Sequence, residues 1–467
     1  MADPQLELTA HLLRRAGAGA SREELEAAAS RPYEDLVEDL VNPERAPDLH
    51  DDLLFRYFPA LVNADTPHIW STRWIWRMAN TRRPLEEKMA LFWHHVFATG
   101  WFKSEHTSTM VGQVQMLREN GLGNLRTILL NLSRDPAMIY WLDNCESHAA
   151  APNENYGREL LELFSMGIGN YTETDVKMAG RAFTGWTFQQ PIPLYPYGLY
   201  PTKFVYNPDD HDDSEKTFLG HSGRLNGEDI IDIIVRQEST ARFIGRHLYN
   251  FFVADEPQVS AWSVVAPQHP AAIDTLAAAF LSSDGDMRVV MRTLFLSDFF
   301  KAARFSRVKC PAEFIAGVLK LSGALREPEP ALAGIGIQSQ VMGQALFDAP
   351  SVEGWHTGKE WLDGGTLTDR VNFAVAQVRD PERPGVKAIV RRLGANGSSV
   401  APADFVDRCL ELAGPVSVGD GTRSVLLDAA QSEGDLRFDD DSASERSASR
   451  VARMISLIVA APEYQFA

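Results

Sequence analysis

The sequence has little cysteine: Cys145, Cys310 and Cys409 are the only three, and they are far apart. An odd number of widely spaced cysteines argues against a disulfide framework and against a zinc site built from thiolates. No Cys-x-x-Cys-His motif occurs, which excludes covalent attachment of a c-type haem. Each cysteine is most simply a small buried hydrophobic residue, and only Cys145 has polar surroundings.

Long apolar runs and long basic runs are also missing. No apolar stretch approaches the ~20 residues that a membrane-spanning helix needs, and residues 1–7 lack the basic and apolar regions of a secretory leader. The formal net charge is -18, and no run of five basic residues occurs. Because neutralising nucleic-acid phosphates requires clustered lysine and arginine, we expect no nucleic-acid partner. From the missing apolar run and leader we expect no membrane partner and a cytoplasmic location.

Several well-known catalytic motifs are absent as well. The chain has no Gly-x-Ser-x-Gly elbow, no Walker-type phosphate loop and no dinucleotide fingerprint. No repeat of fixed period is found, which argues against a solenoid. With 467 residues, 45% of them hydrophobic and 23% charged, the chain has the composition of an ordinary globular protein with one large or two moderate domains.

Helical patterns dominate what is present. Ser21 and Glu24 form a capping box, and Pro84 opens a helix that runs to Ala98 and is stopped by Gly100. Other amphipathic helices are predicted at 34–41, 69–80, 110–119, 122–133, 227–236, 240–253, 271–282, 286–301, 311–323, 366–378, 386–394, 403–413 and 443–461. We therefore predict a mainly α fold, a multi-helix bundle or array.

Two segments interrupt this helical pattern. Between 186 and 220, prolines alternate with aromatic residues, so this segment cannot be a helix. Residues 204–206 and 216–219 within it favour strands, and we predict one β-hairpin whose turn spans 207–214. The second segment, 348–365, is rich in glycine and tryptophan, and its aromatic content indicates an ordered loop.

The sequence also suggests how the chain is divided. A helical domain is predicted for 1–378, and the charged and proline-containing stretch 379–385 has the composition of a linker. Residues 386–467 would then form a small helical C-terminal region.

Ionisable residues are densest between 153 and 186. A helix over 154–166 places Glu154, Arg158 and Glu162 four residues apart on one face, where opposite charges pair. Glu159 lies three residues before Glu162, on a neighbouring face. Two close carboxylates can share a proton or a cation, since each perturbs the pKa of the other. A solvated helix face with salt bridges is the plainer interpretation of the same pattern.

Two histidine-containing motifs can supply metal ligands. His94 and His95 are adjacent on a helix and diverge by about 100°, so at most one of them faces a given site. Glu87 lies on the face of His94, which favours that histidine as a ligand. The acidic cluster around His211 and Asp212 offers the oxygen ligands that Ca²⁺ and Mg²⁺ prefer, although an aspartate-capped turn explains it equally.

Several segments together resemble the bacterial domain-of-unknown-function 1800 family. They are 12–17 (LLRRAG), 88–94 (KMALFWH), 97–99 (FAT), the block 153–186, 211–212 (HD), 216–220 (KTFLG), 342–344 (MGQ), 352–355 (VEGW) and Trp361. The resemblance implies that His94, His211 and Asp212 belong to family motifs, but it assigns no catalytic residue. A Trp-His-x-His-Phe motif is common in that family, whereas this chain has Trp-His-His-Val-Phe at 93–97. Relatives often carry export leaders.

Three hypotheses for the function follow. The first is an enzyme, a metal-assisted hydrolase with a divalent ion as its candidate cofactor and a small molecule, peptide or glycan as its substrate. The second is a non-catalytic binding or scaffold protein with a buried polar network, and the third is a haem or redox protein that uses His94 or His211. The candidate site residues are Glu159, Glu162, Arg158 and Arg181 for catalysis, His94, His211 and Asp212 for the metal, and Trp186, Trp355 and Asn155 for the substrate.

Overall fold

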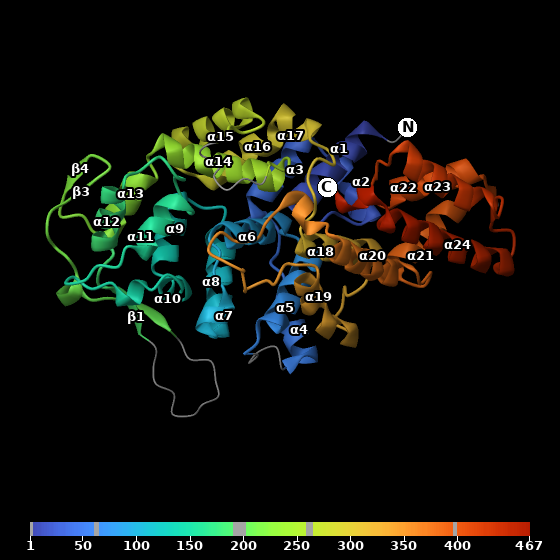
Figure 1. Cartoon of the computed structure of the whole chain (residues 1–467). Coiled ribbons are helices and arrows are strands. Elements are labelled where there is room, and N and C mark those ends of the chain that lie inside the picture. The colour runs from blue at the N-terminus through green and yellow to red at the C-terminus, as the bar shows by residue number, and fades with distance from the viewer. Residues whose placement is uncertain (1–2, 60–64, 190–201, 258–264, 396–398) are drawn as a thin grey trace.

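The computed structural model describes residues 3–59, 65–189, 202–257, 265–395 and 399–467. These residues form 24 α-helices and six short strands, which confirms the predicted mainly α fold. The helices make an elongated array in which the C-terminal helices form one end and the strands between 186 and 223 lie toward the other (Figure 1). Within the described residues, no helix is both long enough and apolar enough to cross a bilayer.

The first part of the array is organised around a buried helix. Its helices are α1 (Pro4–Ala16), α2 (Arg22–Ala29), α3 (Tyr33–Val41), α4 (Asp52–Tyr57), α5 (Pro67–Asn80), α6 (Pro84–Val96), α7 (Trp101–Ser104), α8 (Thr107–Asn120), α9 (Leu125–Ser133) and α10 (Pro136–Trp141). Pro84 lies at the first turn of α6, as predicted, and Met89, Phe92 and Trp93 are completely buried. Helix α6 is apolar around most of its circumference because α1, α3, α5 and α8 all pack on it.

Nine of the described helices come from the middle of the chain. They are α11 (Asn155–Glu162), α12 (Glu173–Ala182), α13 (Gly227–Ile234), α14 (Glu238–Phe252), α15 (Pro270–Ser282), α16 (Met287–Leu296), α17 (Asp298–Ala302), α18 (Pro311–Ser322) and α19 (Ile335–Val341). The single helix predicted over 286–301 is divided at Ser297, whose hydroxyl accepts a hydrogen bond from the Phe300 N–H and caps α17. The helix predicted over 154–166 ends early, at Glu162.

The C-terminal helices pack on the rest of the array. They are α20 (Gly364–Val378), α21 (Pro384–Gly394), α22 (Pro402–Leu412), α23 (Asp420–Gln431) and α24 (Asp441–Ala460). Helix α24 packs on α20 and α21, and α21 packs on α18. The last residues are tied to the body, because the Ala467 N–H donates to the Arg307 carbonyl over 2.8 Å.

The strands pair differently from the prediction. Strand β2 (Lys203–Tyr206) pairs with β1 (Trp186–Gln189), and β3 (Lys216–Phe218) pairs with β4 (His221–Gly223), in two separate antiparallel sheets. The predicted hairpin between 204–206 and 216–219 is therefore wrong, although both segments are strands. A third pair joins β5 (Ser399–Val400) to β6 (Leu436–Arg437). The prolines and tyrosines of 190–201 lie outside the described residues.

The loop that was predicted at 348–365 is held against α6. Trp355 and Trp361 are 6% and 7% exposed, so two buried indoles anchor it. Gly354 has φ +82°, and a Cβ built there would lie 2.5 Å from the His95 carbonyl oxygen. Only glycine permits this backbone conformation at so close an approach.

Candidate functional site

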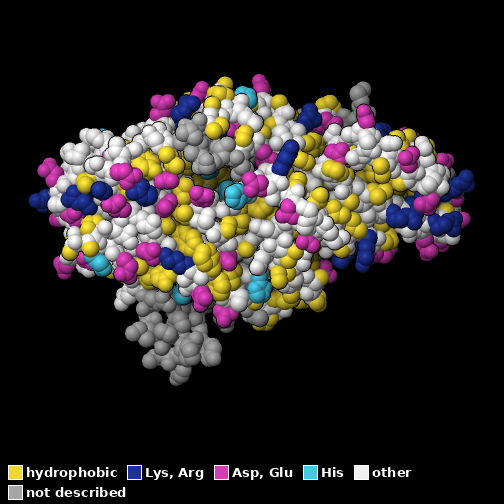
Figure 2. Space-filling model, viewed as in Figure 1, with side chains coloured by type: hydrophobic (Ala, Val, Ile, Leu, Met, Phe, Trp, Pro, Cys, Tyr) yellow, Lys and Arg dark blue, Asp and Glu magenta, His cyan; other side chains and the backbone are white. Residues whose placement is uncertain are grey.

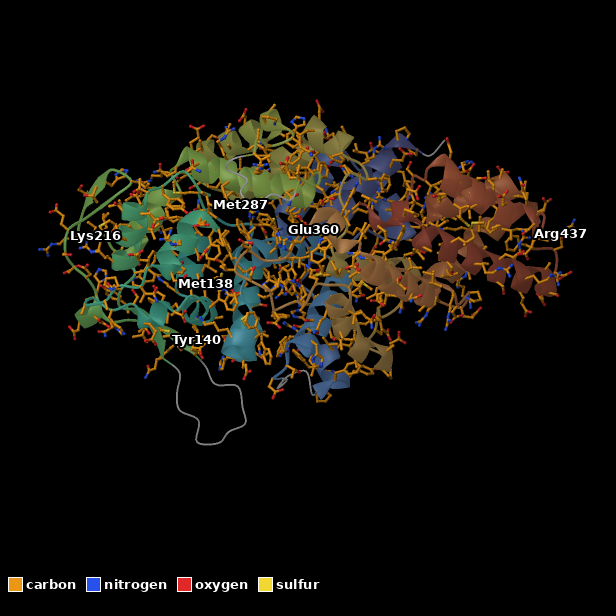
Figure 3. All side chains as sticks on the ribbon, in the orientation of Figure 1. Met138, Tyr140, Lys216, Met287, Glu360 and Arg437 are labelled. Carbon is orange, nitrogen blue, oxygen red and sulfur yellow. The ribbon has the colours of Figure 1, made fainter. Side chains whose placement is uncertain are left out.

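A large cleft lies between α6, the end of α11, α14 and the loop 350–357. Its volume is about 960 Å³, which is in the range of small-molecule sites. We call it the central cleft. Glu360 lines it and lies near the middle of the molecule (Figure 3).

Three histidines line the central cleft: His95 from α6, His247 from α14 and His356 from the loop, where it contacts Glu360 at 3.0 Å. The His95 ring stacks between Phe251 and Trp355, with centroid distances of 6.4 and 6.3 Å. Burial, and then the charge of Arg307, lowers the pKa of His95 to about 4. Burial, and then the charges of His95 and Arg246, lowers the pKa of His247 to about 3. Both imidazoles are therefore neutral at physiological pH and present a nitrogen that can accept a hydrogen bond or bind a metal.

Three carboxyl groups gather at one side of the cleft. Glu162 and Glu353 line it, and Glu159 lies on α11, one turn before Glu162. Burial, followed by the negative charges of Glu162 and Glu353, raises the pKa of Glu159 to about 7, while Arg158 opposes the shift. Glu159 thus holds a proton over part of the neutral range, as a group in acid–base catalysis must.

The Glu162 carboxylate is held by its neighbour. The Tyr171 hydroxyl donates a hydrogen bond to Glu162 Oε2 over 2.9 Å. This bond fixes the glutamate at the cleft wall. Of the two acids, Glu162 lines the cleft and can contact a bound molecule, whereas Glu159 does not line it.

The two arginines of the cleft wall are both paired. Arg242 contacts Asp274 at 2.6 Å, and Arg246 donates to Glu256 Oε2 over 2.8 Å and to the Val265 carbonyl over 2.7 Å. These pairs fix the α14 side of the cleft.

Arg158 and Arg181 lie elsewhere, in salt bridges of their own. Arg158 donates two hydrogen bonds to the Glu173 carboxylate, over 2.9 and 2.7 Å, on the exposed side of α11 and α12. Arg181 donates from Nε to Asp212 Oδ2 over 2.6 Å and from Nη2 to the Ser214 hydroxyl. Neither arginine lines the central cleft.

Asp212 and His211 belong to this same network near the β3 strand. Although burial opposes it, hydrogen bonds from Arg181 and Ser214 hold the pKa of Asp212 well below its usual range. The His211 Nδ1 contacts the Thr184 carbonyl at 2.9 Å. Lys216, whose ammonium donates to the Asp212 carbonyl, lies near one end of the molecule, well apart from Glu360 (Figure 3). We call this group the α12–β3 network.

His94 lies in the core rather than in the cleft. Its Nε2 accepts a hydrogen bond from the Phe347 N–H over 3.0 Å, and burial, followed by the charge of His95, lowers its pKa to about 3. The structure therefore brings His94 next to Trp355 but not to His211 or Asp212.

The three predicted substrate-binding residues are separated as well. Trp355 lines the central cleft. Trp186 is buried, and its indole N–H donates to Asn226 Oδ1 over 3.0 Å. Asn155 donates to the Leu142 carbonyl over 3.1 Å and holds the start of α11.

The described residues contain no group of three or more His, Cys, Asp or Glu side chains that could hold a metal ion. The three histidines of the central cleft are therefore not part of any such group.

The sequence analysis weighed His95 but favoured His94, and it missed His247 and Glu353 as cleft residues. A signal for His247 exists in α14, where Ser239, Arg242, Arg246 and Asn250 recur at three- and four-residue spacing on a helix that is otherwise largely apolar. Such a polar stripe indicates a face directed toward solvent or a ligand.

By its fold and its cleft, this protein is a mainly helical array with a large cleft lined by polar and aromatic side chains. A family model described as a protein of unknown function (DUF1800) matches residues 11–466. The chain therefore belongs to this family, as the resemblance of its motifs indicated, and the match crosses the predicted linker at 379–385. Comparisons with curated proteins and with solved structures gave no match.

Proposed function

We propose that the protein is a hydrolase that uses general acid–base chemistry in the central cleft. The observation that carries the proposal is the raised pKa of Glu159, about 7, beside the carboxyl group of Glu162 at the cleft wall. Two neighbouring carboxyl groups, of which one retains its proton, divide the roles of acid and base between them.

In this scheme Glu159 and Glu162 act as one unit. The proton retained by the pair is delivered to the leaving group, and the carboxylate left at the cleft wall activates a water molecule. His95 and His247 are neutral and orient a polar substrate by hydrogen bonds, while the Trp355 side of the cleft supplies apolar contact. Two carboxyl groups with these roles are the requirement for hydrolysis of glycosidic bonds, which makes a glycan the first substrate class to test.

The experiment is a panel of 4-nitrophenyl glycosides, esters and phosphate esters, assayed from pH 5 to pH 9. Turnover of one class should fall about a hundredfold or more in Glu159→Gln, since general acid–base groups contribute factors of about that size. The matched control is Glu173→Gln, which changes an exposed glutamate that pairs with Arg158. Equal activity of the wild type and Glu159→Gln on every active substrate would contradict the assignment.

A second function, a non-catalytic binding or scaffold protein, is supported by a different observation. Arg158, Arg181 and Asp212 are each engaged in a salt bridge, as residues of a structural network are. On this hypothesis no substrate of the panel is turned over, while a ligand of the central cleft still raises the melting temperature by binding the folded state.

A further inference from the structure

A second large cavity lies at the junction between the two ends of the chain. Its volume is about 450 Å³, and residues from α1, α2, α18, α21 and the end of α22 line it. In Figure 1 the N-terminal helices α1 and α2 lie beside the C-terminal helices. We call this the basic cavity.

The charge of the basic cavity is opposite to that of the chain. Of the described residues that line it, eight are lysine or arginine and four are glutamate, whereas the whole chain has 45 basic and 63 acidic residues. Figure 2 shows side chains of both signs on the face that it presents, with lysine and arginine also gathered toward the C-terminal end.

Three of the four glutamates are already engaged. Glu313 forms ion pairs with Arg307 and Lys88. Glu463 accepts hydrogen bonds from the Gly419 N–H over 2.8 Å and from a threonine hydroxyl, and Glu382 pairs with a lysine at 2.5 Å. These carboxylates therefore do not neutralise the remaining cations.

Several of the cations have no direct side-chain partner. The side chains of Lys320, Arg326 and Arg391 make neither a hydrogen bond nor an ion pair with any residue that the structure describes, and the nearest opposing charge of the first two is Glu24. The Arg14 Nε is buried without an acceptor. Among the described residues, the Lys309 ammonium contacts only Tyr464: its carbonyl oxygen at 2.7 Å and the face of its ring at 4.1 Å.

The surroundings of the cavity disfavour positive charge on its lysines. Burial, followed by the charges of Arg14 and other arginines, lowers the pKa of Lys309 well below its ordinary value. Burial also lowers the pKa of Lys320, with Glu24 acting in the opposite direction and Arg326 in the same one. A bound anion would relieve the repulsion among these cations, because an opposite charge stabilises the charged form of each.

The rest of the wall is apolar. Leu25 and Ile389 are 2% and 3% exposed, and Phe305 and Leu412 also line the cavity. Arg14 stacks on Phe305 with its guanidinium carbon 4.7 Å from the ring centroid, so a basic group and an apolar surface adjoin. A ligand that fills this space needs an apolar body as well as an anionic group.

We propose that the basic cavity binds an amphiphilic organic anion, with its carboxylate or phosphate head group at Arg14 and Lys309, whose charges act on each other, and its apolar part against Leu25 and Ile389. Such a site is independent of the central cleft and gives the C-terminal helices a binding role.

The test is calorimetric titration of the full chain with four probes: octanoate, octyl phosphate, inorganic phosphate and 1-octanol. At least one of the two amphiphilic anions should bind more tightly than both inorganic phosphate and octanol, and whichever binds better identifies the head group. Equal or tighter binding of octanol would show that charge is not recognised. Equal or tighter binding of inorganic phosphate would show that the apolar wall is not used, and no binding of either amphiphilic anion would overturn the proposal.

Variants locate the binding site. Lys309→Met should weaken binding of the amphiphilic anion about tenfold or more, which corresponds to the loss of one charge-assisted contact. Lys309→Arg should retain binding, and Lys177→Met, which removes an exposed lysine outside the cavity, should leave it unchanged. Arg391→Gln, at an exposed position of the rim, should weaken binding severalfold even if a buried variant fails to fold. Unchanged affinity in both Lys309→Met and Arg391→Gln would overturn the proposal.

Discussion

Carboxyl groups beside the central cleft and in the α12–β3 network have pKa values that are shifted in opposite directions. In the network, Asp212 accepts hydrogen bonds from Arg181 and Ser214, and its pKa lies well below the usual range. At the cleft, Glu159 is surrounded by two other acids, and its pKa is raised to about 7. A carboxylate with a cation partner stabilises the fold, whereas one placed among acids is costly and is therefore a candidate for chemistry.

The comparison predicts that removing the paired carboxylate has the larger effect on stability. Asp212→Ala should lower the free energy of unfolding by about 2–3 kcal/mol, because it leaves Arg181 without its partner in a largely buried position. Urea unfolding at pH 7 measures this. The double variant Asp212→Ala, Arg181→Met should recover part of the loss, and an unchanged stability of Asp212→Ala would show that the network contributes nothing.

The cleft loop offers the next test. Gly354→Ala should destabilise the protein by about 2 kcal/mol, since it combines positive φ with a clash against the His95 carbonyl oxygen. Gly169 is a matched control: its φ is +92°, but a Cβ there meets nothing within 4 Å. Gly169→Ala should therefore cost only about 1 kcal/mol, from backbone strain alone. Equal losses in the two variants, measured by thermal unfolding, would mean that the contact with α6 is unimportant.

The histidines of the cleft predict a loss of stability in acid. The pKa of His95 is 6.5 ordinarily and about 4 in the folded protein, so between these values the unfolded chain binds more protons. Stability is therefore complete above pH 6.5 and falls as the pH drops toward 4. The pKa shift corresponds to about 3 kcal/mol, which we reduce to about 1–2 kcal/mol because His95 is only partly buried. In urea unfolding at pH 7, 6, 5 and 4, His95→Phe should lose less stability than the wild type on going from pH 7 to pH 4. Parallel profiles would contradict this.

The smallest expected effect is that of Glu159, which makes the protein less stable as the pH rises rather than as it falls. Glu159 has a raised pKa, so the folded protein holds the extra proton between pH 4.5 and 7, and stability falls as the pH rises through that window. Glu159→Gln should be more stable than the wild type by about 1 kcal/mol at pH 8, a value reduced for the partial exposure of the group, and equal to it at pH 4. A destabilised Glu159→Gln at pH 8, in the same unfolding assay, would show that the carboxylate is structural.

Much of the helical framework was predictable because its signals are local. Pro84 marks the start of α6, and Ser21 and Glu24 form their capping box in the structure as predicted. The strand pairing was not predictable in the same way. β2 pairs with β1, at 186–189, where the sequence suggested no strand, and register of this kind depends on the fold around it.

The site was predictable only in part. The neighbouring acids Glu159 and Glu162 follow from helical spacing alone, and the structure places them beside the cleft. Which of His94 and His95 faces the cleft depends on how α6 is rotated in the core, and that rotation is set by packing from four other helices rather than by α6 itself. Glu353 comes from a loop nearly 200 residues further along the chain, and no local pattern connects it to α11.

The most direct test of the account is the pKa of Glu159 itself. Carboxyl-carbon NMR on protein labelled with ¹³C at the glutamate side chains, titrated from pH 3 to pH 9, resolves individual groups, and the resonance missing from Glu159→Gln assigns the residue. We expect the Glu159 carboxyl to titrate with a midpoint near 7, well above the ordinary glutamate value of 4.5. A midpoint at 4.5 would contradict it, because the acids at the cleft wall would then be ordinary ionised carboxylates with no proton to give.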